Sequence, residues 1–340
     1  MEKSVFIGID VSKNTLDVAM HELCAPEKFR EKQFKNDVSG YKSLIGWIEK
    51  SGTKLNICAI CMEHTGVYSL TPSIFFSEQG LFVCVEPALK IKRNMGITRG
   101  KNDIVDARRI AVYAMEKRLK LEPFMVPAKQ LLQLKQLLTY RDQLRKICTS
   151  FKNSIKSHKR YELNSKFDFV SNDIESQITE QEEKIKKVDA MINKIINQDE
   201  DLKSNSDLAR SVIGIGPVVT AFLLAYTNNF TCFDNARKFN CYTGVAPFEN
   251  TSGTSIRGRT TVSHLANKRI KTLLFNAANA AVKADPELRN YYLRKKNEGK
   301  DHQLIMNAIC CKLIYRVFAV VKRRSPFVSL YKEKIEKTLA

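Results

Sequence analysis

The sequence predicts an α/β N-terminal domain with a mixed sheet, a long helical connector and a mainly helical C-terminal domain. Strand-like apolar runs alternate with helical patterns up to about residue 120, long amphipathic helices follow, and Gly-punctuated helical segments fill the remainder. A chain of 340 residues also exceeds what one hydrophobic core usually organises. We place the domains at residues 1–122, 123–205 and 206–330, followed by a basic tail at 331–340.

The N-terminal domain is predicted from the order of its strand and helix patterns. Three sequential strands are followed by helix, strand, helix, strand and helix, which is an α/β arrangement with a mixed sheet. The expected strands are Val5–Val11, Thr15–Met20, Lys32–Lys35, Ile57–Met62 and Leu81–Glu86, and the expected helices include Val38–Ile48 and Asp103–Glu116.

The connector is predicted from apolar or aromatic residues that recur at spacings of three and four. This spacing indicates two amphipathic helices that are long enough to pair as a hairpin or a short coiled coil. A packed spacer and a dimerising element both fit this pattern. The residues are Leu137, Tyr140, Leu144, Ile147, Phe151 and Ile155, then Ile174, Ile178, Ile185, Val188, Ile192 and Ile195.

The C-terminal domain is predicted to be helical around an irregular patch. Helical runs cover Val212–Tyr226, Asn267–Ala284 and His302–Arg323, and a segment rich in Gly, Pro and Ser extends from Gly244 to Gly258. Sequence alone favours a solvated loop for that segment.

Charge and cysteine usage limit the possible partners and compartment. Lys and Arg number 56 against 36 Asp and Glu, so the net charge of +20 attracts polyanions, above all nucleic acid. The basic residues are spread along the chain, which disfavours a membrane surface, and we find neither a transmembrane span nor a secretion signal. Nine Cys without framework spacing, including Cys58 and Cys61 in a predicted strand, are typical of reduced structural thiols. We expect a cytoplasmic, nucleoid-associated protein.

Four carboxylates stand at the ends of predicted elements. Asp10 ends the first strand, Glu63 ends the fourth, and Asp103 and Asp106 share one face at the start of a helix. Carboxylates that converge repel one another unless cations compensate them, and their hard oxygens suit Mg²⁺ or Mn²⁺. Two such ions can stabilise the attacking and leaving oxygens of a phosphodiester displacement, so we predict a nuclease site.

Two of the four acids also have a plainer explanation. The helix dipole by itself accounts for acids at a helix start, which applies to Asp103 and Asp106. Asp17 is interpreted as an ordinary surface acid, and His64 as a residue that orients Glu63.

Three motifs carry a specific resemblance. They read Gly-Ile-Asp-Val-Ser-Lys from Gly8, Glu-His-Thr-Gly-Val-Tyr from Glu63, and Lys-Asn-Asp-Ile-Val-Asp-Ala-Arg from Lys101. Their order and spacing resemble the DEDD-type insertion-sequence transposases, whose relatives include the pilin-gene DNA invertases. The resemblance implies a ribonuclease H fold of the Holliday-junction resolvase type, with Asp10, Glu63, Asp103 and Asp106 as catalytic metal ligands.

Two C-terminal motifs are candidates for contact with DNA. The Gly-rich turn at Val212–Pro217 is similar to a helix-hairpin-helix clamp whose backbone N–H groups, at Gly214 and Gly216, face a phosphate, although a plain tight turn also explains it. The family resemblance implies that Ser252, which precedes a Gly, is the nucleophile. Ser255 and Ser263 are the alternatives. Leu265-Ala266-Asn267 departs from the family pattern, which affects the expected loop geometry and not the assignment of Ser252.

Basic residues near both candidate sites are predicted to contact the nucleic-acid backbone rather than to read its sequence. They are Lys13, Lys90, Lys92, Arg93, Arg99 and Lys101 in the N-terminal domain, and Arg257, Arg259, Lys268 and Arg269 in the C-terminal domain.

The sequence and the resemblance together predict a recombinase that cuts and rejoins DNA. The resemblance further implies a homo-oligomer, a dimer or tetramer, that combines acids from one subunit with Ser252 from another, and a structured bridge RNA that pairs with donor and target DNA. A metal-dependent junction nuclease without a covalent intermediate is the main alternative. A sugar-kinase-like or actin-like ATPase would need a Gly-rich adenosine loop that we do not find, and a non-catalytic scaffold leaves the four acids unexplained.

Overall fold

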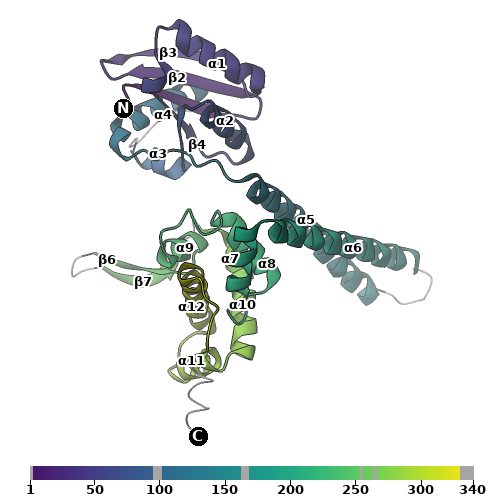
Figure 1. Cartoon of the computed structure of the whole chain (residues 1–340). Helices are drawn as coiled ribbons and strands as arrows, with labels where there is room; N and C mark the ends of the chain where they lie inside the picture. Colours follow the sequence, from purple (N-terminus) through teal and green to yellow (C-terminus); the bar gives the residue numbers. More distant parts are fainter. Residues whose placement is uncertain (1–2, 95–101, 162–167, 253–255, 263–265, 330–340) are drawn as a thin grey trace. The chain divides into compact units, whose positions relative to one another are not determined.

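The computed structural model in Figure 1 describes residues 3–94, 102–161, 168–252, 256–262 and 266–329. The chain forms two compact units, Met1–Val126 and Pro127–Ala340.

The N-terminal unit is built on a five-stranded mixed sheet in the order β3-β2-β1-β4-β5. β1 is antiparallel to β2 and β2 to β3, whereas β1, β4 and β5 run parallel. The strands are β1 (Val5–Val11), β2 (Thr15–Glu22), β3 (Ala25–Lys35), β4 (Cys58–Glu63) and β5 (Phe82–Glu86). The predicted mixed sheet is therefore confirmed.

One strand is longer than the sequence predicted. β3 begins at Ala25, whereas the charge-rich sequence indicated a strand only from Lys32. β3 lies at the edge of the sheet, where few side chains enter the core and charged residues are tolerated, so the apolar alternation is weak.

Helices cover both faces of this sheet. α1 and α2 contribute Leu44 and Phe76 to a core with Ile7, and α4 contributes Ile110 to a second core with Phe6. Phe6 and Ile7 are successive residues of β1, so the two cores lie on opposite faces. The elements are α1 (Val38–Lys50), α2 (Val67–Glu78), α3 (Ala88–Asn94), α4 (Asp103–Glu116) and the short turns η1 (Leu55–Ile57) and η2 (Arg118–Lys120).

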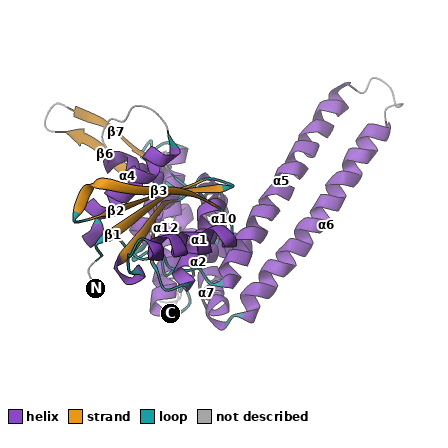
Figure 2. Cartoon of the chain, turned by 90° about the horizontal axis from the view of Figure 1, so that it is seen from above, coloured by secondary structure: helices purple, strands orange, loops and turns teal. Residues whose placement is uncertain are grey.

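The C-terminal unit is mainly helical, as predicted. Figure 2 shows α5 and α6 running side by side as a long pair, while coiled-coil packing of this pair stays a prediction. Leu138 of α5 and Ile192 of α6 belong to the same core as Phe222 and Leu274. The helices are α5 (Lys129–Tyr161), α6 (Asp168–Gln198), α7 (Glu200–Arg210), α8 (Pro217–Tyr226), α9 (Ala236–Thr243), α10 (Lys268–Ala284), α11 (Pro286–Asn297) and α12 (His302–Arg323).

The segment expected to be a loop contains a β-hairpin. β6 (Pro247–Ser252) pairs antiparallel with β7 (Ile256–Val262). Polar residues dominate both strands, so the sequence lacks the apolar alternation of a half-buried strand. The loop interpretation of the whole segment from Gly244 to Gly258 was therefore wrong.

α12 is long and apolar enough to cross a membrane by length and composition alone. Half of its most apolar window is buried within the protein, and residues such as Ile309, Leu313 and Val317 lie in the core of the C-terminal unit. This burial is the pattern of the core helix of a folded domain.

Candidate active site

Two of the predicted acids lie at the carboxyl ends of neighbouring parallel strands, Asp10 as the last residue but one of β1 and Glu63 as the last residue of β4. The pairing of β1 with β4 ends at Ile9 and Met62, and Asp10 and Glu63 follow these residues directly. Because the carboxyl ends of parallel strands meet at one edge of a sheet, both acids stand at the same edge.

α4 brings the other two acids to the same face of the sheet. A Cβ added to Gly8 would lie 2.2 Å from the carbonyl oxygen of Ala107, so α4 lies directly on β1. Asp10, two residues after Gly8, points to this same face. Asn102 caps the N-terminus of α4: its side chain accepts a hydrogen bond from the backbone N–H of Ile104 at 3.0 Å, and Asp103 and Asp106 lie in the first turn of the helix.

The charges of these acids act on one another. The pKa of Asp10 is raised from the ordinary value of 3.8 to about 6, chiefly by burial and then by the negative charges of Asp103, Asp106, Glu63 and Asp17, in that order. All three other predicted acids therefore lie close enough to Asp10 to oppose its ionisation.

The carboxylate oxygens of the four acids suit a hard divalent cation, but the side chains are not drawn together into a metal-binding cluster. Within the described part of the chain, the carboxylates of Asp10 and Glu63 have no hydrogen bond or ion pair, whereas Asp106 accepts from Arg109 Nη1 at 2.7 Å. Among the described residues, no three His, Cys, Asp or Glu side chains form a group that could hold a metal ion. Like charges without a cation repel, which accounts for carboxylates that act on Asp10 yet do not form a tight cluster. Hard oxygen donors whose charge is uncompensated fit Mg²⁺ or Mn²⁺.

The predicted basic residues of the N-terminal unit differ in availability. Lys90 forms a 2.7 Å ion pair with the buried carboxylate of Glu86, so its positive charge is already neutralised by that carboxylate. Lys13, Lys92 and Arg93 are exposed. The remaining two predicted residues, Arg99 and Lys101, lie outside the described residues.

The predicted nucleophile is the last residue of β6. The backbone of Ser252 pairs with Ile256 at the end of the hairpin, and Arg257 lies opposite Thr251. The side chains of Ser252, Arg257 and Arg259 lie outside the described part of the structure, as do residues Ser255 and Ser263.

The Gly-rich turn between α7 and α8 is a packing site. Gly214 has a φ of +96°, and a Cβ added there would lie 2.6 Å from Ala281 Cβ and 2.7 Å from Ala277 O, so the turn rests directly on α10. Gly216 precedes α8 and has open space at its Cβ position, which leaves it accessible to a ligand.

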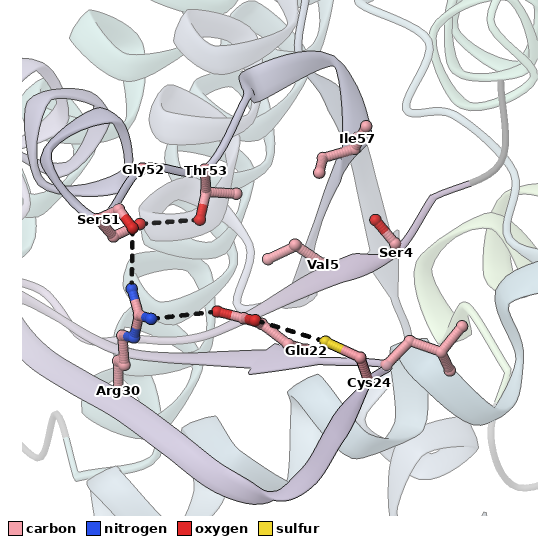
Figure 3. A pocket seen from close by; sticks show the side chains of 10 residues that line it. Ser4, Val5, Glu22, Cys24, Arg30, Ser51, Gly52, Thr53 and Ile57 are labelled. Carbon is pink, nitrogen blue, oxygen red and sulfur yellow. Dashed lines mark hydrogen bonds and ion pairs between the residues drawn. The ribbon is translucent and has the colours of Figure 1, made fainter.

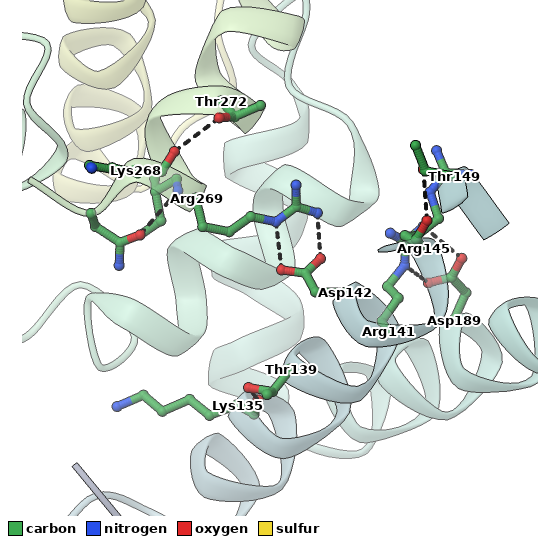
Figure 4. A network of polar contacts seen from close by, with 12 residues as sticks. Lys135, Thr139, Arg141, Asp142, Arg145, Thr149, Asp189, Lys268, Arg269 and Thr272 are labelled. Atoms are coloured by element: carbon green, nitrogen blue, oxygen red, sulfur yellow. Dashed lines mark hydrogen bonds and ion pairs between the residues drawn. The ribbon is translucent and has the colours of Figure 1, made fainter. Parts of the chain in front are cut away.

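Arg269 already has a carboxylate partner. Its guanidinium binds both carboxylate oxygens of Asp142 and so joins α10 to α5, with Nε at 2.5 Å from Oδ2 (Figure 4). Arg141 forms a similar pair with Asp189 between α5 and α6. A phosphate would have to compete with Asp142 for Arg269, whereas Lys268 beside it is exposed.

Both units match models of transposase families. A model described as "Transposase", of the DEDD type, matches residues 7–159, and one described as "Transposase IS116/IS110/IS902 family" matches residues 206–293. The pilin gene-inverting protein of Moraxella bovis is 25% identical over 326 residues, which are 95% of this chain and 97% of that protein. The insertion element IS110 uncharacterized 43.6 kDa protein of Streptomyces coelicolor is 30% identical over 155 residues, 46% of this chain and 37% of that protein.

The chain belongs to the IS116/IS110/IS902 family of transposases. It is thus an enzyme of the DNA transposase and recombinase class, and the resemblance found in the sequence is confirmed. The first matched range contains the four acids and the second contains Ser252. Among solved structures, T. thermophilus RuvC in complex with a Holliday junction substrate is 13% identical, with a TM-score of 0.26 over 36% of this chain and 99% of that one.

A cavity of about 500 Å³ in the N-terminal unit of the transposase lies away from the acids. Val5 lines it, at the opposite end of β1 from Asp10. Figure 3 shows Arg30 crossing its wall, where it contacts Glu22 at 3.4 Å and the carbonyl oxygen of Ser51 at 3.2 Å. This cavity is therefore separate from the acidic site.

Asp17 is the residue that the sequence interpretation misplaced. It was expected on the surface, but it is 4% exposed and accepts a 2.9 Å hydrogen bond from Gln33 Nε2. It lies directly opposite Asp10 in the pairing of β2 with β1, so both side chains point to the same face. Glu63 lies opposite Glu86 in the same way, so four carboxylates form a row across the sheet. Only the antiparallel register reveals Asp17, because its own sequence context resembles a surface strand.

Proposed function

We propose that this transposase cuts and rejoins DNA at insertion-sequence ends and at a target, using Ser252 together with a divalent-metal site made of the four acids. The observation that supports this most is the environment of Asp10, a half-buried carboxylate whose ionisation is opposed by the negative charges of Asp103, Asp106 and Glu63. Such a concentration of negative charge in a chain with a net charge of +20 calls for a specific counter-ion.

In this proposal the acids prepare the phosphate for attack. Asp10, Glu63, Asp103 and Asp106 would hold Mg²⁺ or Mn²⁺, which supplies charge neutralisation at the scissile phosphate. Arg109 forms an ion pair with Asp106. In this proposal it would release that carboxylate when the metal ion binds, and its positive charge would remain close to the site. The supporting fold is of the resolvase type in our proposal, with the acids on a mixed sheet and a covering helix.

Ser252 would act as the nucleophile. Its hydroxyl oxygen forms a bond to phosphorus while the bond from phosphorus to a deoxyribose oxygen breaks; the hydroxyl proton is lost to solvent and the leaving oxygen takes up a proton. A free deoxyribose hydroxyl of another DNA strand then loses its proton and attacks the phosphorus of this serine ester; the serine oxygen leaves, takes up a proton, and a phosphodiester is restored. No net energy source is required, because one ester replaces another.

The proposed partners follow from charge and family resemblance. DNA is the substrate, and a structured guide RNA and further copies of this chain, as a dimer or tetramer, complete the assembly. The excess of 56 basic over 36 acidic residues favours both nucleic acids, because neutralised phosphates release counter-ions. Such a protein would act where the DNA is, in the cytoplasm and on the nucleoid.

Trapping a covalent intermediate tests the role of the serine. Ser252→Ala is expected to abolish a denaturant-stable protein–DNA adduct and to leave DNA binding in a gel-shift assay unchanged, because only the hydroxyl is lost. Ser255→Ala and Ser263→Ala serve as matched controls that keep the adduct. An adduct of normal yield in Ser252→Ala would contradict the assignment.

A metal-dependent junction nuclease is the second candidate. It is favoured by the placement of all four acids in one compact unit, Met1–Val126, to which Ser252 does not belong. On that mechanism Ser252→Ala would cut DNA at the normal rate, whereas Asp10→Asn would not cut.

A further inference from the structure

Asn36 connects the two segments that follow the acid-bearing strands. It comes directly after β3. Its side-chain Nδ2 donates to the carbonyl oxygen of Ser12 at 2.8 Å and to that of Tyr68 at 3.3 Å. Ser12 follows Asp10 by two residues, and Tyr68 lies in the first turn of α2, in the segment that begins with Glu63.

The orientation of the Asn36 amide is fixed by a buried tyrosine. The hydroxyl of Tyr41 donates to Asn36 Oδ1 at 2.6 Å, and Tyr41 is only 1% exposed. Its ring packs against Phe75 and Phe76 of α2. Because the hydroxyl proton occupies Oδ1, the two N–H bonds of Nδ2 must face the two backbone carbonyls.

The backbone of Asn36 adds a third connection. Its N–H donates to the carbonyl oxygen of Asn14 at 2.9 Å, in the turn between β1 and β2. One residue thus contacts the turn after Asp10 twice and the start of α2 once. The ladder between β1 and β4 ends at Ile9 and Met62, before either acid, so these contacts act where strand pairing no longer holds the two segments together.

We propose that Asn36 is a positioning residue that fixes the spacing of Asp10 and Glu63 for divalent-ion binding. The inference rests on the proposed metal-dependent function. Partners that orient metal ligands without touching the ion typically change metal affinity by about 10–100-fold when removed. Asn36 acts through the backbone of both ligand-bearing segments, and Tyr41 acts through Asn36.

Calorimetric titration of Mn²⁺ into the full-length protein without DNA tests this role directly. Asn36→Ala is expected to weaken Mn²⁺ binding about tenfold or more. Tyr41→Phe keeps the packed ring and loses only the hydroxyl, so it is expected to weaken binding in the same direction but less. Asn14→Ala is the matched control, because its exposed side chain is removed while its carbonyl still accepts from Asn36.

A second measurement separates positioning from simple stability. Unfolding in EDTA, followed by the fluorescence of Trp47, reports the stability of the N-terminal unit without metal. Unchanged Mn²⁺ affinity in Asn36→Ala and Tyr41→Phe, with or without lower stability, overturns the proposal; if Asn36→Ala does not fold, Tyr41→Phe decides. If Mn²⁺ binding is absent in the wild type or survives in Asp10→Asn, the metal site itself is wrong and both proposals fail.

Discussion

Removing the charge of Asp10 should stabilise the metal-free transposase. The carboxylate of Asp10 is half-buried, has no hydrogen bond or ion pair within the described residues, and is opposed by the charges of its acidic neighbours. Asp10→Asn keeps the size and shape of the side chain and removes only the charge. The substitution that is expected to abolish metal binding is therefore expected to increase stability in EDTA.

The size of the effect follows from the pKa of Asp10. Its folded-state pKa is about 6, above the ordinary 3.8, so ionisation of Asp10 destabilises the folded state. The penalty is absent below pH 3.8, grows as the pH rises from 3.8 to about 6, and is complete above that pH. At about 1.4 kcal/mol per pH unit the difference is at most ~3 kcal/mol, which solvent screening of this partly exposed group reduces to ~1–2 kcal/mol.

Trp47 provides the assay. It is the only Trp of the chain and packs against Phe34 in the N-terminal unit, with ring centroids 5.8 Å apart. Thermal unfolding followed by its fluorescence in EDTA at neutral pH should show a higher Tm for Asp10→Asn, by about 3–6 °C per kcal/mol for a unit of this size. Glu49→Gln, which removes an exposed charge from α1, is the control and should not change Tm.

Two results would refute this reasoning. The first is an equal Tm for wild type and Asp10→Asn at neutral pH. The second is a Tm difference that persists when the pH is lowered well below the ordinary carboxyl value of 3.8, where Asp10 is protonated in both the folded and the unfolded state. Addition of Mn²⁺ should reverse the order, because the wild type gains binding energy and Asp10→Asn does not.

Two glycine substitutions test the packing of α4 on β1 and of the Gly-rich turn between α7 and α8 on α10. Gly8→Ala would place a Cβ 2.2 Å from Ala107 O and 2.3 Å from Ala111 N, so α4 must move. We expect the free energy of unfolding in urea, followed by Trp47 fluorescence, to fall by ~1–3 kcal/mol or more, and Mn²⁺ binding to weaken. Unchanged stability would show that α4 does not rest on β1. Gly214→Ala combines a φ of +96° with a Cβ 2.6 Å from Ala281 Cβ, so a loss of at least ~1 kcal/mol is expected by circular dichroism, whereas Gly216→Ala, with open space at its Cβ, should be tolerated.

Much of the fold was predictable because the N-terminal unit has strong local patterns. The apolar strand β1 and the helix that begins at Asp103 have clear local sequence patterns, and both occur where the sequence placed them. The sequence prediction made β3 too short and missed the hairpin of β6 and β7. Their strands are polar, and they are strands because of the neighbour with which they pair rather than because of their own alternation.

The candidate site divides in the same way. Asp10, Glu63, Asp103 and Asp106 could be singled out because each lies at or near the end of a strand or the start of a helix, and an element end is a local property of the chain. The burial of Asp17 and the attachment of Arg269 to Asp142 could not be foreseen, because each depends on a residue from another element.

The sequence by itself determined which residues carry charge at strand and helix ends, and hence which family the protein resembles. Tertiary structure alone decided which groups face one another: the strand register that sets Asp17 beside Asp10, the approach of α4 to Gly8, and the amide of Asn36 between two backbone segments. The physical reason is that helix and strand propensity act over a few neighbouring residues. Register and packing instead minimise the free energy of contacts between residues that are distant in the chain.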